Sequence, residues 1–110
     1  MDYSLRVIRL FRFLQTNRDP VTLTLSKQLL RSSTSIGANI TEAKSGESRA
    51  DFVHKYSIAQ KEARESLYWL KLLLKAELVS ENQLAPLIQE TNELIAIITT
   101  IIVRTKNSRA

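Results

Sequence analysis

One predicted helix carries basic side chains together with a tyrosine on a single face. Steps of three, seven and four residues separate the four basic positions, which places them on one side of an α-helix. The set consists of Lys61, Arg64, Tyr68, Lys71 and Lys75. Lys and Arg neutralise phosphates, and an exposed aromatic ring stacks on bases. The pattern therefore indicates a nucleic-acid-binding face. A solvated face, partly neutralised by a Lys61–Glu65 pair, remains the alternative interpretation.

The N-terminal helix adds Arg6, Arg9 and Arg12 to the candidate phosphate contacts. The chain has 110 residues and a formal charge of +5, and its basic excess is concentrated in the first 46 residues. An arginine fork donates two hydrogen bonds to one phosphate. An amphipathic, arginine-rich start is also typical of a membrane-surface helix or a mitochondrial presequence. A membrane-surface role needs a free apolar face, which a four-helix bundle would bury. The apolar face is also too regular and too aromatic to belong to a cleaved presequence, so we expect a packed first helix.

A second polar set lies on the second predicted helix. Arg31, Asn39 and Glu42 all lie off its main apolar seam. They form either a polar site or a hydrogen-bonded network between helices or subunits, and we expect the network. The neighbouring serine-rich block has no adjacent base, so we expect it to serve in close packing.

The composition argues against catalysis. The chain has no Cys and one His, His54, so cysteine zinc sites, thiolate nucleophiles and haem ligation by several histidines are excluded. A carboxylate di-iron bundle needs two Glu-x-x-His units, which a single His cannot supply. We therefore expect no enzymatic activity and no cofactor.

Four amphipathic segments must position these residues. With only 2 Gly and 2 Pro, the chain favours long helices over strands and turns. Helical periodicity predicts helices at about residues 3–16, 21–44, 49–76 and 81–106, with short links. The predicted fold is all-α, an antiparallel up-down-up-down four-helix bundle that forms a single domain over residues 1–110.

Two apolar patterns carry further expectations. The seam of the second helix consists of Val21, Leu25, Leu29, Ser32, Ile36, Ile40 and Ala43. On the third helix, Ile58, Trp69 and Leu72 lie on a second apolar arc, away from the main stripe. A helix with two apolar faces needs two partners, so this arc predicts a subunit contact in a homo-oligomer.

No segment is expected to cross a membrane. The longest run of apolar residues and threonines, residues 94–103, is far shorter than the ~20 residues that a membrane helix needs. We expect a cytoplasmic protein.

The centre of the chain resembles a known bacterial family. The matching stretch is RSSTSIGANITEAKSGESRADFVHKYSIAQKEARESLYWLKLL, residues 31–73. Its marks are the serine-rich block ending in IGAN, then Glu42, Asp51, Phe52, Ile58, Ala59, Glu62, Glu65, Trp69 and Leu70. This stretch resembles a family of bacterial four-helix-bundle proteins. Its first members were named as open reading frames in intervening sequences of large-subunit ribosomal RNA genes, and some are labelled ribosomal proteins. The resemblance implies a homopentamer.

The chain is also distantly similar to the accessory variability determinant proteins of diversity-generating retroelements. That similarity implies partners in nucleic acid, RNA or DNA, and in a reverse transcriptase. We therefore expect a non-enzymatic, oligomeric, RNA-associated accessory factor. The alternatives are a protein–protein scaffold without nucleic-acid binding and a membrane-surface module.

Overall fold

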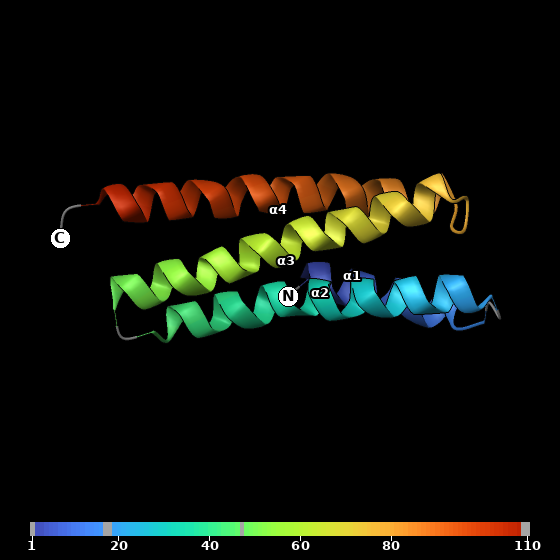
Figure 1. Cartoon of the computed structure of the whole chain (residues 1–110), viewed down its shortest axis with the longest axis horizontal. Helices are drawn as coiled ribbons and strands as arrows, with labels where there is room; N and C mark the ends of the chain where they lie inside the picture. The colour runs from blue at the N-terminus through green and yellow to red at the C-terminus, as the bar shows by residue number, and fades with distance from the viewer. Residues whose placement is uncertain (1, 17–18, 47, 109–110) are drawn as a thin grey trace.

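Four helices make up the described part of the chain, residues 2–16, 19–46 and 48–108 of a computed structural model. The helices are α1 (Asp2–Leu14), α2 (Pro20–Lys44), α3 (Arg49–Lys75) and α4 (Glu81–Asn107), and these residues contain no strand. Consecutive helices run in opposite directions along a body of 52 × 20 × 19 Å (Figure 1). The prediction of an all-α fold with four helices is confirmed.

Polar side chains fix where three of the helices begin. Asp19 caps α2 by accepting hydrogen bonds from the Thr22 hydroxyl (2.8 Å) and from the Val21 and Thr22 backbone N–H groups. The Thr22 hydrogen bond is the main reason that the pKa of Asp19 lies below its usual value. Ser48 and Ser80 cap α3 and α4 by accepting from backbone N–H groups three residues ahead. Each cap satisfies donors that the first helical turn leaves free.

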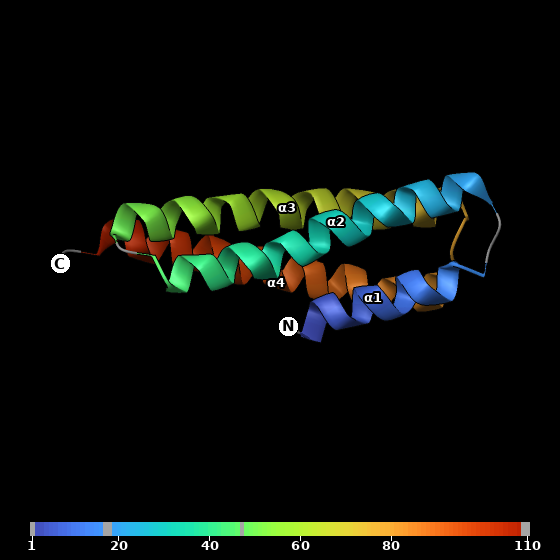
Figure 2. The ribbon, with the colours of Figure 1, turned by 90° about the horizontal axis from the view of Figure 1, so that it is seen from below.

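The helices are unequal in length. α1 has 13 residues, whereas α2 has 25 and α3 and α4 have 27 each. α2 and α4 pack along opposite flanks of α3, and α1 lies against α2 and α4 in one half of the molecule only (Figure 2). Among the described residues, the backbones of α2 and α4 do not approach each other closely. The bundle therefore has four helices in one half and three in the other.

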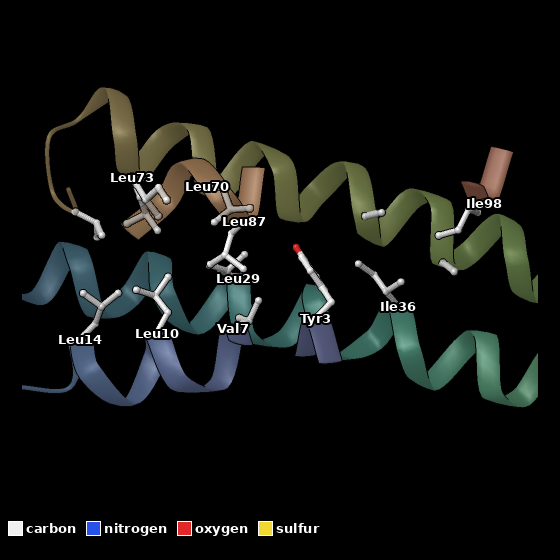
Figure 3. Packing of buried hydrophobic residues seen from close by; sticks show 14 of the residues in the cluster. Tyr3, Val7, Leu10, Leu14, Leu29, Ile36, Leu70, Leu73, Leu87 and Ile98 are labelled. Carbon is white, nitrogen blue, oxygen red and sulfur yellow. The ribbon is translucent and has the colours of Figure 1, made fainter. Parts of the chain in front are cut away.

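The core lies along the line where the helices face one another. Its apolar side chains point inward from all four helices (Figure 3). They include Val7, Leu10, Leu29, Ile36, Leu70, Leu73, Leu87 and Ile98. Tyr3 is also buried, and its hydroxyl is hydrogen-bonded to the Thr91 hydroxyl at 2.7 Å. Burial raises the pKa of Tyr3 above its ordinary value, because the phenolate would lose its hydration.

Small residues let α2 and α3 approach closely. Ser32 and Ser66 are fully buried, and their hydroxyl oxygens lie 2.8 Å apart. Ala59 and Ala63 of α3 are also fully buried. The serine-rich block therefore packs between helices.

The predicted seam of α2 is wrong at its start. Val21 is 54% exposed, whereas Thr22 and Ser26 are buried. Both buried hydroxyls find local acceptors, Thr22 in the Asp19 carboxylate and Ser26 in the Thr22 carbonyl oxygen at 2.6 Å. A hydroxyl bonded in this way can be buried at little cost. The apolar pattern could not identify these two residues, because it counted only side-chain type.

α4 has the length and apolar composition of a membrane-spanning helix. Its most apolar window has a mean hydropathy of 1.3, and 22% of that window is buried. The expectation that no segment could span a membrane counted only unbroken apolar runs, so it missed α4. The core helix of a soluble protein, which is mostly buried, passes the same test of length and composition. α4 contributes Leu84, Leu87, Thr91, Ile98 and Ile102 to the core.

Candidate nucleic-acid interface

The outward face of α3 carries the basic stripe that the sequence suggested. Lys61, Arg64, Tyr68, Lys71 and Lys75 are all exposed or partly exposed, and none is buried. The side of α3 that faces the core holds Ala59, Ala63, Leu70 and Leu73, which are fully buried. Because polar and buried residues occupy opposite sides of one helix, the five side chains point into solvent over ~21 Å of helix length.

The cations of this stripe are not neutralised within the described residues. None of Lys61, Arg64, Lys71 and Lys75 has an ion pair or hydrogen bond there. The Lys61–Glu65 pair of the alternative, solvated-face interpretation is not formed among the described residues, where the Glu65 carboxylate pairs with Arg31. Tyr68, at 57% exposure, is an accessible aromatic ring among the four charges.

The arginines of α1 differ from one another. Arg6 makes a two-pronged ion pair with Glu90 of α4, in which its Nε donates to Oε1 at 2.8 Å. This hydrogen bonding raises the pKa of Arg6. Arg9 and Arg12 are exposed and have no ion pair among the described residues. Arg6 therefore contributes to packing α1 on α4, and two of the three candidates remain free for an anion.

The two basic sets do not merge. α1 and α3 lie on opposite sides of the core, and their backbones do not approach each other closely (Figure 2). The exposed arginines of α1 and the stripe of α3 thus face away from each other within one chain. A single strand could not contact both sets across one flat surface.

Beside the α3 stripe, the seam between α2 and α3 holds a polar cluster, which we name the Arg31 cluster. Arg31 forms ion pairs with Glu62 (3.4 Å) and Glu65, and the Trp69 indole N–H donates to Glu65 at 3.1 Å. The Tyr68 ring packs edge-on against Trp69 with ring centroids 5.0 Å apart. The cluster therefore borders the basic stripe through two aromatic rings. Sequence reasoning missed both acidic partners of Arg31, since they lie 31 and 34 residues away along the chain.

The other two members of the expected network lie apart from Arg31. The Asn39 amide donates to the Ser35 carbonyl oxygen of its own helix at 2.9 Å. Glu42 pairs with Lys55 of α3 at 2.6 Å. Arg31 and Glu42 thus link α2 to α3 at separate places.

The second apolar arc of α3 is half covered. Ile58, Trp69 and Leu72 are partly buried, and Trp69 packs against the core. They flank the seam with α2 and keep part of their surface in solvent. Whether another subunit covers them stays a prediction.

Neither a metal-ligand set nor an orphaned polar group marks a catalytic centre in the described part of the chain. Residues 2–16, 19–46 and 48–108 contain no group of three or more His, Asp or Glu side chains placed to hold a metal ion. In the same residues, every buried side-chain nitrogen and oxygen has a hydrogen-bond partner.

Comparison with known proteins identifies the family of this chain and a similar solved structure. The profile of a family described as "23S rRNA-intervening sequence protein" matches residues 1–100. A crystal structure of a protein of unknown function from the S23 ribosomal protein family of Bacteroides thetaiotaomicron is 41% identical, covers 92% of each chain and has a TM-score of 0.84. A search of curated proteins finds no match.

Proposed function

Because this chain belongs to the 23S rRNA-intervening sequence protein family, we propose that it is a non-enzymatic, RNA-associated accessory factor of the cytoplasm that works as a homo-oligomer. The observation that carries the proposal is the outward face of α3. Four solvent-accessible cations without ion-pair partners among the described residues surround an accessible tyrosine. Cations that track a backbone and a ring that stacks on bases are the parts of a sequence-tolerant single-strand site.

Oligomerisation strengthens this proposal. One stripe of four cations is a small electrostatic footprint, and single surface charges are easily screened by salt. In a homopentamer, which the family resemblance implies, symmetry repeats the stripe five times and multiplies the formal charge of +5 per chain. Such an assembly binds through counterion release and depends steeply on salt. The distant resemblance to the accessory variability determinant proteins of retroelements suggests a reverse transcriptase as a further partner.

The alternative function is a protein–protein scaffold without nucleic-acid binding. It is favoured by the half-covered arc of Ile58, Trp69 and Leu72, which offers apolar surface beside the Arg31 cluster. In that case the α3 cations would only keep the assembly soluble.

Salt-dependent binding separates the two functions. We compare the wild type with Lys71→Gln/Lys75→Gln on α3, measuring fluorescence anisotropy with a short single-stranded RNA and a DNA duplex over a range of salt. The matched control is Lys27→Gln/Lys106→Gln, which removes the same charge from positions off the α3 stripe. The α3 variant should flatten the log–log salt slope by about one unit for each phosphate that it no longer neutralises. The control should keep the wild-type slope.

Two outcomes would remove the RNA proposal. One is an absence of wild-type binding at low salt, and the other is an equal weakening in the α3 variant and its control. An Arg9→Gln/Arg12→Gln variant tests α1 in the same assay. The oligomer is tested by light scattering on the wild type and on Trp69→Ala. A wild-type mass near 12.5 kDa at micromolar concentration contradicts it.

A further inference from the structure

We propose that the half of the bundle left open by α1 is a docking groove for an acidic amphipathic helix of a partner protein. α1 begins at Asp2 and covers one half of α2 and α4, while both longer helices continue beyond it (Figure 2). The length difference of about 12 residues between α1 and α2 corresponds to ~18 Å of helix. Over that length, the place that α1 occupies in the other half is open.

The walls of this groove are hollowed and apolar. α2 contributes Gly37 and Ile40, beside a hollow of about 730 Å³. Ile97 and Ile101 of α4 line a smaller hollow of about 310 Å³. The Ile97 side chain is 56% exposed, so this apolar surface is open to a ligand. Apolar side chains on two parallel walls are what a helix-in-groove site provides.

The far end of the groove is closed by three helices. A hollow of about 520 Å³ lies between the end of α2, the start of α3 and the end of α4. Phe52 of α3 lines it, together with Ala43 and Thr105. The end of the groove thus combines the apolar side chains of Ala43 and Phe52 with the basic side chains of Lys44 and Arg49.

The charges that line these hollows are basic in balance. Among Lys44, Arg49, Arg104 and Glu42, the one acid is already paired with Lys55. Arg49 donates to the Ser108 carbonyl oxygen at 2.7 Å and remains a cation. Lys44 on one wall and Arg104 on the other have no ion pair within the described residues. Charge complementarity therefore calls for acidic flanks on the occupant.

The occupied half of the bundle shows how a helix fits these walls. α1 packs there through Tyr3, Val7, Leu10 and Leu14, spaced by four, three and four residues. A second copy of α1 would satisfy the same spacing, but its polar face is rich in arginine and would meet Lys44 and Arg104. The occupant is therefore a helix with the apolar spacing of α1 and with Glu or Asp on its flanks.

The test uses a labelled synthetic helix and the full chain. The probe is a fluorescent peptide of about 14 residues, with Leu at the spacing of α1 and Glu at flanking positions. A matched peptide has Lys in place of each Glu, and a third has Ser in place of each Leu. Anisotropy should report binding of the Glu peptide that is at least about tenfold tighter than binding of either control peptide.

Variants locate the binding. Ile97→Asp should weaken the Glu peptide by about tenfold. Val103→Asp should leave it unchanged, because Val103 is similarly exposed on α4 but does not line these hollows. The double variant Lys44→Glu/Arg104→Glu should bind the Lys peptide more tightly than the Glu peptide. These charge reversals keep the fold testable, since both side chains are exposed.

Several results would overturn the proposal. They are the absence of Glu-peptide binding, equal binding of the Glu and Lys peptides, and equal effects of Ile97→Asp and Val103→Asp. Displacement of the Glu peptide by single-stranded RNA, or by anionic phospholipid vesicles, would assign the groove to that ligand instead. None of these peptide-binding measurements depends on the basic side chains of α3. The docking proposal can therefore be refuted while the RNA proposal stands, and the reverse also holds.

Discussion

Replacing Ser32 by valine tests whether close packing defines the α2–α3 interface. Ser32 is fully buried against Ser66, and their hydroxyl oxygens lie 2.8 Å apart. Valine replaces the hydroxyl with two methyl groups. Serine and valine have similar helix propensities, so the effect of the substitution comes mainly from packing and hydrogen bonding.

The magnitude follows from two effects. Overpacking a filled interface costs about 1–3 kcal/mol, and removal of the hydroxyl hydrogen bond costs about 0.5–1.5 kcal/mol. The Ser66 hydroxyl keeps its hydrogen bond to the Glu62 carbonyl oxygen at 2.9 Å, so no polar group is stranded. We expect the free energy of unfolding to fall by about 2–4 kcal/mol, a large part of the stability of a small domain.

Thermal melting followed by circular dichroism measures the change. At about 4 °C per kcal/mol for a chain of this size, Ser32→Val should melt about 8–16 °C below the wild type at equal protein concentration. Ser32→Ala adds no volume and should lower the melting temperature by about a quarter of that. Ser66→Ala in the Ser32→Val background should recover part of the stability. A Ser32→Val protein that melts at or above the wild-type temperature would show that the interface has spare room, and would refute the argument.

Further expectations concern the core and the titrating groups. Leu29→Ala should cost about 2–5 kcal/mol, whereas Val21→Ala on the same helix should change the melting temperature little, because Val21 is exposed. The raised pKa of Tyr3 means that its contribution to stability is complete below about pH 10 and is lost as pH rises through the folded-state pKa. Tyr3→Phe should therefore flatten the alkaline loss of stability in melts between about pH 9 and 11. The lowered pKa of Asp19 means that its contribution is present above about pH 4 and is lost as pH falls below that. Asp19→Asn retains a capping side chain, so it should reduce the acid slope of stability without a large destabilisation at neutral pH.

The helices were predictable because their patterns are local. Each expected helix lies within two residues of an observed one at both ends, since caps and apolar periodicity are both visible in the sequence. The set of α2 residues that are buried against the core was only partly predictable. Thr22 and Ser26 can be buried because their hydroxyls form hydrogen bonds within the first turns of α2. A prediction from side-chain polarity alone placed Val21 in the core instead, although Val21 is exposed.

Ion pairs between helices were the least predictable part of the candidate site. Glu65 has a basic residue four positions before it on its own helix, yet it pairs with Arg31 of α2. The choice depends on the rotation of α2 about its axis, which small residues such as Ser32 and Ser66 set through close approach. Periodicity defines the face of a helix and leaves its exact rotation against a neighbour to packing.

The position of Trp69 connects the two proposed uses of α3. Its indole N–H is bonded to Glu65 of the Arg31 cluster, and its ring contacts Tyr68 of the basic stripe. A ring of subunits closed through the α2–α3 seam would therefore place each basic stripe beside a subunit boundary. Failure of Trp69→Ala to assemble would then weaken RNA binding as well, by removing both the repeated charge and the support behind Tyr68. The docking groove lies between α2 and α4, away from this seam, so peptide binding should persist in the same variant.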